Sequence, residues 1–317
     1  MPELSDCLHR EGTVVLETIE PRDGQRRIWQ FDSPREILRA YDAASLGALL
    51  RRLDAETDSG RYASGYLAYE AGYALLPIGG GAPVSDEPLA WFGIYDAPRE
   101  GPPDLAAAFD GGSFHLRFRV FDFTREAYAE AFRAVKHHVF EGDAYQINLT
   151  GRFSFLFEGS VGALYADLVR RQRNTLGGYL HAGERRLLSR SPELFFLRDG
   201  DRIVTRPMKG TVHRGKSSAE DAAHRVALAA DPKSRAENLM IVDLLRNDLS
   251  VVCEPGTVRV PALFATEVHE TLIQMTSTVE GKLRADTPTS DVIRALFPCG
   301  SVTGAPKIRA MQIIRAL

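Results

Sequence analysis

The segment Ser189–Thr211 places an acid and an amine on either side of a predicted β-hairpin. Glu193 precedes the first strand, and Lys209 follows the second. Where two such groups face one cavity, the acid serves as a general acid or base and the amine as a nucleophile. The spacing alone favours a simpler arrangement, a glutamate at a strand edge and a surface lysine, unless the strand register brings the two groups together.

The turn of this hairpin decides the register. A two-residue turn at Asp199-Gly200 points Lys209 away from the face that carries Glu193. A three-residue loop sets Glu193 opposite Pro207 and leaves Lys209 on the same face as a diagonal neighbour, at roughly 7 to 8 Å. Gly200 permits such a bulged loop. Chemistry at this site therefore requires a three-residue loop or an equivalent irregularity.

A third acidic group, Glu237, lies in a predicted helix that follows Asp231-Pro232. A buried carboxylate costs several kcal/mol unless a cation or hydrogen bonds compensate it. The spacing favours a structural ion-pair network with Asp243, Arg246 and Asp248. The alternative is a Mg²⁺ ligand, since Mg²⁺ binds through only one or two carboxylates and keeps several waters.

Two further segments carry polar or backbone groups. The run YQINLT, residues 145–150, alternates Gln146, Asn148 and Thr150 on one face, which by itself indicates a half-buried strand. The run GSVTGAPK, residues 300–307, is a Gly-rich loop that enters a helix at Pro306, and a helix N-terminus can hold a carboxylate or phosphate. It lacks the spacing of a P-loop, so a tight turn remains the simpler interpretation.

The elements that must position these residues indicate an α+β protein with antiparallel sheets and covering helices. We expect strands at Thr13–Thr18, Arg27–Phe31, Tyr62–Tyr69, Leu89–Tyr95, Ser113–Val120, Tyr145–Phe157 and in a hairpin over Leu194–Thr205. We expect helices at Pro34–Tyr41, Ser45–Leu53, Thr124–Phe140, Val161–Arg173, Ala236–Leu249 and Pro306–Leu317, with Ala236–Leu249 buried nearly all round.

The stretch Gly101–Gly112 is predicted to be a connecting loop, and it suggests domains at residues 1–112 and 113–317. The last helical pattern reaches Leu317 without a Gly or Asn C-cap, so we expect a fold that lacks its C-terminal part.

Composition excludes several classes of protein. The 317 residues include 44% hydrophobic and 26% charged residues, which excludes wholesale disorder. A net charge of −3 gives no bulk reason to expect nucleic acid or an anionic membrane as partner.

The chain has no apolar run of the roughly 18 residues that a spanning helix needs and no signal-peptide pattern at its start, so we expect a cytoplasmic protein. Cys7, Cys253 and Cys299 lack the spacing of a disulfide framework or zinc site.

The residues of these segments and their order along the chain resemble those of one enzyme family. The runs YQINLT, SRSPELFF, TRPMKGT, AENLMIVDLLRNDL, QMTSTVEGKL and FPCGSVTGAPKIRAMQII are similar to the chorismate-utilising enzymes. This group contains anthranilate synthase component I and aminodeoxychorismate synthase component I. The residue before Gly-Thr differs between the two branches of this group. The branch that aminates chorismate at C4 has a lysine there, as this chain has Lys209, whereas the anthranilate-forming branch has an alanine. The resemblance covers Thr124–Leu317 nearly continuously.

The resemblance implies a role for each matching residue. Lys209 would attack C2 of chorismate as a neutral amine, so its pKa should be lowered, and Glu193 would be the general acid and base. Glu237 would bind Mg²⁺, the expected cofactor. The expected substrate contacts are Gln146, Gly210, Thr211, Gln274 and Thr303. Gln274 stands where many relatives have a histidine, and Gln146 stands where the isochorismate-forming relatives have a water-activating lysine.

The implied function is the formation of 4-amino-4-deoxychorismate for 4-aminobenzoate and folate. A glutamine amidotransferase subunit would supply the ammonia, and some relatives carry a fused downstream lyase. Family members continue for roughly another hundred residues, with further substrate and metal contacts. Two alternatives therefore stay open: anthranilate synthase component I, and a non-catalytic module that binds chorismate.

Overall fold

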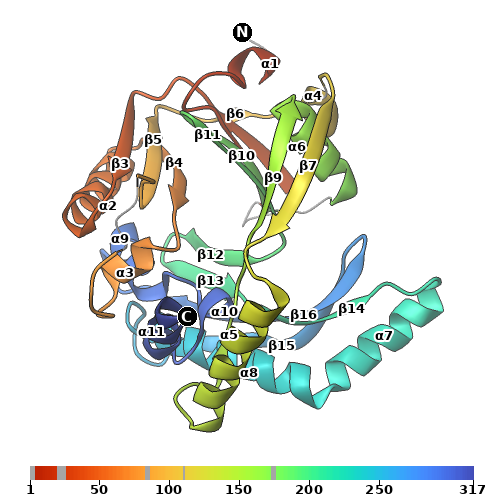
Figure 1. Cartoon of the computed structure of the whole chain (residues 1–317). Helices are drawn as coiled ribbons and strands as arrows, with labels where there is room; N and C mark the ends of the chain where they lie inside the picture. The colour runs from red at the N-terminus through yellow and green to blue at the C-terminus, as the bar shows by residue number, and fades with distance from the viewer. Residues whose placement is uncertain (1–3, 20–25, 83–85, 110, 173–175) are drawn as a thin grey trace. The chain divides into compact units, whose positions relative to one another are not determined.

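The computed structural model describes residues 4–19, 26–82, 86–109, 111–172 and 176–317. The chain forms two compact units (Figure 1), which we describe separately. Unit 1 comprises Met1–Leu75, Gly80–Arg119 and Phe155–Pro192, and unit 2 comprises Leu76–Gly79, Val120–Ser154 and Glu193–Leu317. The chain passes between them within strands β7 (Phe114–Phe121) and β9 (Phe153–Gly159), which pair with each other. Residues 113–119 and Phe155–Pro192, expected in the second domain, thus belong to unit 1, and Leu76–Gly79, expected in the first, belongs to unit 2.

Besides the β7–β9 pair, the described residues of unit 1 form two antiparallel sheets. The larger has the order β11-β10-β1-β2-β6, and the smaller has the order β3-β5-β4. Their bounds are β1 Val14–Ile19, β2 Arg26–Phe31, β3 Glu36–Ala40, β4 Tyr62–Leu67, β5 Ala90–Tyr95, β6 Arg99–Glu100, β10 Leu176–Ala182 and β11 Arg185–Ser191. The helices are α1 Leu4–Cys7, α2 Ala43–Asp58, α3 Ala71–Leu75, α4 Leu105–Phe109 and α6 Val161–Arg171. The predicted end of α6 at Arg173 lies outside the described residues.

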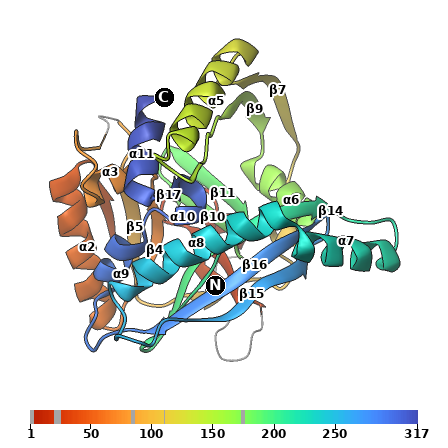
Figure 2. The same cartoon turned by 90° about the horizontal axis from the view of Figure 1, so that it is seen from below.

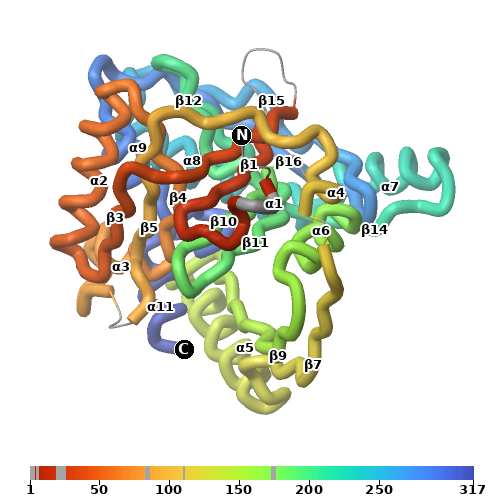
Figure 3. The backbone as a smooth tube through the Cα atoms, turned by 90° about the horizontal axis from the view of Figure 1, so that it is seen from above, coloured from red at the N-terminus to blue at the C-terminus, as the bar shows by residue number. Residues whose placement is uncertain are grey.

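Two predictions in unit 1 are wrong. The segment Pro34–Tyr41, predicted as a helix, contains strand β3, which lies beside α2 (Figure 3) and pairs along its whole length with β5. Two helical turns are marginal alone, so the sheet hydrogen bonds and the packing of Ile37 on the core outweigh the local pattern. The predicted loop Gly101–Gly112 contains α4, because Leu105 and Phe109 are buried in the unit 1 core.

Unit 2 is built on one antiparallel sheet and six helices. The sheet has the order β12-β13-β16-β14, and β15 also pairs with β16. The bounds are β12 Leu194–Asp199, β13 Arg202–Arg206, β14 Met208–His213, β15 Arg259–Val268 and β16 Leu272–Lys282, with β8 Gln146–Ile147 and β17 Gly304–Ala305 forming a separate short pair. The helices are α5 Arg125–Phe140, α7 Ser218–Ala230, α8 Pro232–Ser250, α9 Thr289–Leu296, α10 Gly300–Thr303 and α11 Lys307–Ala316.

Helix α8 crosses the face of β15 and β16 (Figure 2) and supplies one side of the unit 2 core. It begins as predicted, with Asp231 accepting a hydrogen bond from the Ser234 N–H (2.7 Å). The prediction that it is buried all round is wrong. Ile241 and Leu245 are buried, whereas Leu239 is 44% exposed, because only one face of the helix meets the sheet.

The predicted strand Tyr145–Phe157 is also corrected. It is divided into β8 and β9, because Gln146 and Ile147 pair with Ala305 and Gly304 of β17 and not with β7, the partner of β9.

In the part of the chain that the structure describes, no helix combines the length and apolar character needed to cross a bilayer.

Candidate active site

The β12–β13 hairpin brings Glu193 to its predicted partner by an unexpected route. Asp199 pairs with Arg202, so the turn contains two residues, Gly200 and Asp201. Neither turn considered from the sequence occurs. A register shift between Leu194 and Leu197 then pairs Leu194 with Arg206. Extended by one residue, this register sets Glu193 opposite Pro207. The irregularity that the chemistry requires is thus a bulge in β12.

Lys209 lies in a second bulge. Met208 pairs with Thr276 and Thr211 with Gln274, so β14 has one residue more than β16 between these pairs. Gly210 has a φ of +90°, and a Cβ there would lie 2.8 Å from the Cβ of Ser234 in α8. Glycine therefore allows both the bulge geometry and its close approach to α8.

The side chains of Glu193 and Lys209 both reach Ser301 of α10. The Lys209 Nζ donates a hydrogen bond to the Ser301 carbonyl oxygen (3.0 Å). The Ser301 Oγ donates to the Glu193 Oε1. The Asn148 Nδ2 also donates to the Ser301 carbonyl oxygen (2.7 Å), and the Cys299 Sγ lies 3.2 Å from the Ser301 Oγ. The acid and the amine thus converge on one residue of the Gly-rich loop.

Ser301 and Cys299 were not identified from the sequence as site residues. The signal for Ser301 was the GSVTGAPK run, which indicated a loop able to hold an anion, and Cys299 directly precedes that run. Asn148 was recognised on the same strand face as Gln146 but was not assigned to the site.

Burial moves the pKa values of the two reactive groups toward each other. Loss of solvent lowers the pKa of Lys209, against the opposing attraction of Glu193, Glu237 and Cys299. Loss of solvent raises the pKa of Glu193, against the opposing effects of Ser301, Lys209 and the Met208 N–H. At a given pH, the neutral amine of Lys209 and the protonated acid of Glu193 are therefore both more populated than in water.

Two glutamines, Gln146 of β8 and Gln274 of β16, carry buried acceptor atoms. The Gln146 Nε2 donates to the Asn148 Oδ1 (3.3 Å), which joins Gln146 to the residues around Ser301. Gln274 of β16 pairs with Thr211 of β14. Among the described residues, neither the Gln146 Oε1 nor the Gln274 Oε1 has a hydrogen-bond partner. Each provides an acceptor for a donor group of a ligand.

Thr303 occupies a different position from the other predicted substrate contacts. Its side chain is fully buried, and its Oγ1 lies 3.3 Å from the carbonyl oxygens of Cys299 and Gly300 in its own loop. Its backbone carbonyl accepts a hydrogen bond from the Asn148 N–H (3.0 Å). The geometry therefore gives Thr303 a role in holding the loop, and substrate contact by this residue stays a prediction.

Glu237 is partly exposed, and its Oε1 lies 3.8 Å from the Lys233 Nζ. Its charge opposes the lowering of the pKa of Lys209, so it acts on the same site. Within the described ranges, no group of three or more His, Cys, Asp or Glu side chains forms a metal cage. Mg²⁺ requires no such cage, because substrate oxygens and waters complete its coordination. A single loosely paired carboxylate beside the site fits one protein ligand to that ion.

The residues expected to form an ion-pair network with Glu237 form separate ion pairs. Arg246 pairs with Asp243 (2.9 Å) at the surface. Asp248 pairs with Lys307 (2.7 Å), and both side chains are largely buried. The Lys307 Nζ also donates to the Leu296 carbonyl oxygen (3.0 Å). The second pair ties the start of α11 to α8, so these residues form two separate ion pairs and not one network.

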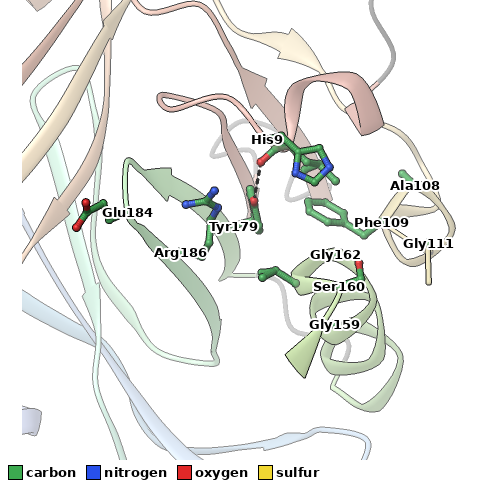
Figure 4. Close-up of a pocket in the computed structure, with 12 residues that line it drawn as sticks. His9, Ala108, Phe109, Gly111, Gly159, Ser160, Gly162, Tyr179, Glu184 and Arg186 are labelled. Carbon is green, nitrogen blue, oxygen red and sulfur yellow. Dashed lines mark hydrogen bonds between the residues drawn. The ribbon is translucent and has the colours of Figure 1, made fainter. Parts of the chain in front are cut away.

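A cavity of about 720 Å³ lies in unit 1 (Figure 4), and its lining residues include none of the predicted site residues. Phe109 and Tyr179 contribute to its wall. The Tyr179 hydroxyl donates to the Leu8 carbonyl oxygen (2.9 Å), and Arg186 donates to the Gly183 carbonyl oxygen (2.5 Å). These polar groups are engaged within the protein and include no paired acid and amine, so the reactive cluster of unit 2 is the candidate active site.

Comparison with known proteins gives a matching family model and curated relatives that are synthases. The profile of the family described as chorismate binding enzyme matches residues 110–317. Aminodeoxychorismate synthase component 1 of Klebsiella aerogenes is 42% identical over 230 residues, which are 72% of this chain and 49% of the relative. Anthranilate synthase component 1 of Thermus thermophilus is 40% identical over 239 residues, 74% of this chain and 51% of the relative. The chain thus spans about half the length of the curated relatives it matches.

The fold has solved counterparts. Anthranilate synthase component I of Streptococcus pneumoniae superimposes with a TM-score of 0.73 at 20% identity, covering 98% of this chain and 76% of that chain. The α+β fold expected from the sequence is confirmed by this likeness. At this identity, the likeness concerns the fold alone.

Proposed function

Because the chain belongs to the chorismate-binding enzyme family, we propose that it replaces the C4 hydroxyl of chorismate with an amino group and forms 4-amino-4-deoxychorismate. One observation carries the proposal. The amine of Lys209 and the carboxylate of Glu193 meet at Ser301 in a partly buried site, where burial lowers the pKa of the amine and raises that of the acid.

The reaction divides one difficult substitution into two steps. The lone pair of neutral Lys209 forms a bond to C2 of the ring, the double bonds shift, and the C4 hydroxyl leaves as water with a proton from Glu193. Ammonia then forms a bond to C4, the double bonds return, and the C2–N bond breaks with its electron pair going to Lys209. The Glu193 carboxylate takes the proton that the incoming nitrogen loses.

Three other residues support binding. Glu237 would hold Mg²⁺, and this ion would neutralise the ring carboxylate of the substrate when bound. The unpartnered oxygens of Gln146 and Gln274 accept hydrogen bonds from hydroxyl groups or from ammonia. Gln146 is an amide and cannot act as a general base on water, which favours ammonia over water as the nucleophile.

A partner would supply the ammonia. The name "component 1" of the relatives refers to one part of a two-part enzyme, and we propose a glutamine amidotransferase subunit as the second part. The product would then serve 4-aminobenzoate and folate synthesis.

The test is to incubate the purified chain with chorismate, Mg²⁺ and ammonium and to identify the product by liquid chromatography and mass spectrometry. We expect 4-amino-4-deoxychorismate, a loss of about 10³-fold or more in kcat for Lys209→Ala, and a chorismate-derived adduct on Lys209 when ammonium is omitted. Lys216→Ala serves as the control, because Lys216 is an exposed lysine outside the site.

Three outcomes would overturn the assignment. Anthranilate as the main product would establish the second candidate, which the similarity to the Thermus thermophilus enzyme favours. Undiminished activity in Lys209→Ala would remove the covalent route. Mg²⁺-dependent chorismate binding by calorimetry without any product would identify a non-catalytic module.

A further inference from the structure

Ser301 contacts both groups to which the reaction is assigned. It lies in α10, between Gly300 and Val302, and is 6% exposed. Its hydroxyl reaches Glu193, which is separated from it by 108 positions, and its carbonyl reaches Lys209, separated by 92 positions. A single residue thus joins a loop before β12, a bulge in β14 and the Gly-rich turn.

The direction of the hydroxyl hydrogen bond follows from its partners. An ionised carboxylate only accepts hydrogen bonds, so the Ser301 O–H donates to Glu193. The Ser301 Oγ is then free to accept from the Cys299 thiol, which lies 3.2 Å away. The proton of the Ser301 hydroxyl is therefore committed to one oxygen of Glu193, and the Glu193 carboxylate also accepts a hydrogen bond from the Met208 N–H.

The backbone carbonyl of Ser301 fixes the amine in the same way. It accepts from the Lys209 Nζ (3.0 Å) and from the Asn148 Nδ2 (2.7 Å), which uses both of its lone pairs. A neutral amine that donates one N–H to this oxygen has its own lone pair directed away from Ser301. That lone pair is the one that must form the bond to the ring in the proposed reaction.

We propose that Ser301 is a positioning residue that holds Glu193 through its hydroxyl and Lys209 through its carbonyl, so that the acid and the nucleophile share one fixed geometry. The inference rests on the proposed function, and it concerns a residue that acts through its neighbours and not by touching the substrate.

The groups that face Glu193 set the sign of the expected effect. They are Lys209 and the Met208 N–H from β14, and Ser301 and Cys299 at α10. Burial is the largest effect and raises the pKa of Glu193, whereas the Ser301 hydroxyl and Lys209 lower it. Removal of the hydroxyl therefore raises the pKa of Glu193 further.

The experiment compares Ser301→Ala with Ser301→Thr, which keeps the hydroxyl. In the ligand-free chain, the protonated carbonyl band of Glu193 is followed against pH by infrared difference spectroscopy and assigned by its loss in Glu193→Gln. We expect Ser301→Ala to shift the Glu193 titration to higher pH and Ser301→Thr to restore it. In the chorismate assay, we expect kcat/KM to fall about 10- to 100-fold in Ser301→Ala, as for the loss of one hydrogen bond to a charged group.

The outcomes separate this inference from the proposed function. A folded Ser301→Ala protein with an unchanged Glu193 titration would overturn the inference whatever the product. Anthranilate as product would overturn the proposed function and leave the titration result intact. If Ser301→Ala does not fold, Ser301→Cys, whose thiol is a weaker donor, must shift the titration in the same direction by less. An unshifted titration in that variant would also contradict the role of Ser301.

Discussion

At the scale of single residues, the site keeps Glu193 in surroundings that disfavour its charge. Its pKa is raised mainly by loss of solvent, although Ser301 and Lys209 oppose the rise. Such a carboxylate serves catalysis at a cost in stability, since a carboxylate with a raised pKa is poorly solvated in its ionised form.

This cost predicts a pH-dependent gain in stability for Glu193→Gln. Between the ordinary pKa and the raised one, the folded state binds a proton that the unfolded state has lost, so wild-type stability falls as pH rises through this window. The neutral amide lacks the penalty. We expect the free energy of unfolding of Glu193→Gln to exceed that of wild type at pH about 8 and to match it near pH about 4.

Urea denaturation at the two pH values measures the effect. Glu141→Gln is the control, because Glu141 is exposed and its Oε1 lies 3.9 Å from the Nδ1 of His137 at the surface. The control should change stability by less than about 0.5 kcal/mol at either pH. A Glu193→Gln protein that is less stable than wild type at the higher pH would contradict the unfavourable surroundings inferred for Glu193.

At the scale of elements, two irregular strands place the acid and the amine. The bulge in β12 sets Glu193 opposite Pro207, and the bulge in β14 sets the direction of Lys209. Regular ladders would alternate the side chains without a change of face, so each bulge moves one reactive group.

Gly210→Ala tests the β14 bulge. The added Cβ meets Ser234 at 2.8 Å in a backbone of positive φ, so the bulge or α8 must shift. We expect a loss of about 2 to 4 kcal/mol in the free energy of unfolding. Gly200→Ala is the matched control: it has a φ of +61° but no atom within 4 Å of the new Cβ, and it should cost about 1 kcal/mol. Equal losses in the two variants would show that the contact with α8 has no effect.

At the scale of the whole molecule, the chain has the fold of the chorismate enzymes and about half the length of its curated relatives. The proposed site lies within unit 2, and each residue that carries the proposal comes from that unit. Chorismate binding by this chain therefore tests directly whether the residues of unit 2 are sufficient to hold the ligand.

Ligand binding should appear as stability of the whole fold. A ligand at 100 times its Kd adds about 2.7 kcal/mol to the folded state. We expect chorismate to raise the Tm only when Mg²⁺ is present, and Glu237→Gln to remove the dependence on Mg²⁺. Asp243→Asn is the control on the same helix, since Asp243 is exposed and pairs with Arg246. A Tm rise that is equal with and without Mg²⁺ would remove the metal from the proposal.

The sequence by itself was sufficient for the elements whose pattern depends on near neighbours. Helix α8 begins at the predicted start, Asp231-Pro232, and α5 begins directly after Thr124, which was predicted as its first residue and serves as its N-cap. These starts depend on contacts between residues three positions apart. The motif runs also indicated the family, the acid and the amine without any structure.

Only the tertiary structure decided how distant segments meet. The strand β3, the one-sided burial of α8 and the division between β8 and β9 all follow from partners that local periodicity does not contain. The same holds for Ser301, whose two reactive neighbours lie 92 and 108 positions away. Contacts at such separations depend on strand register and packing, and a shift of one residue in either bulge would have changed which side chains share the site.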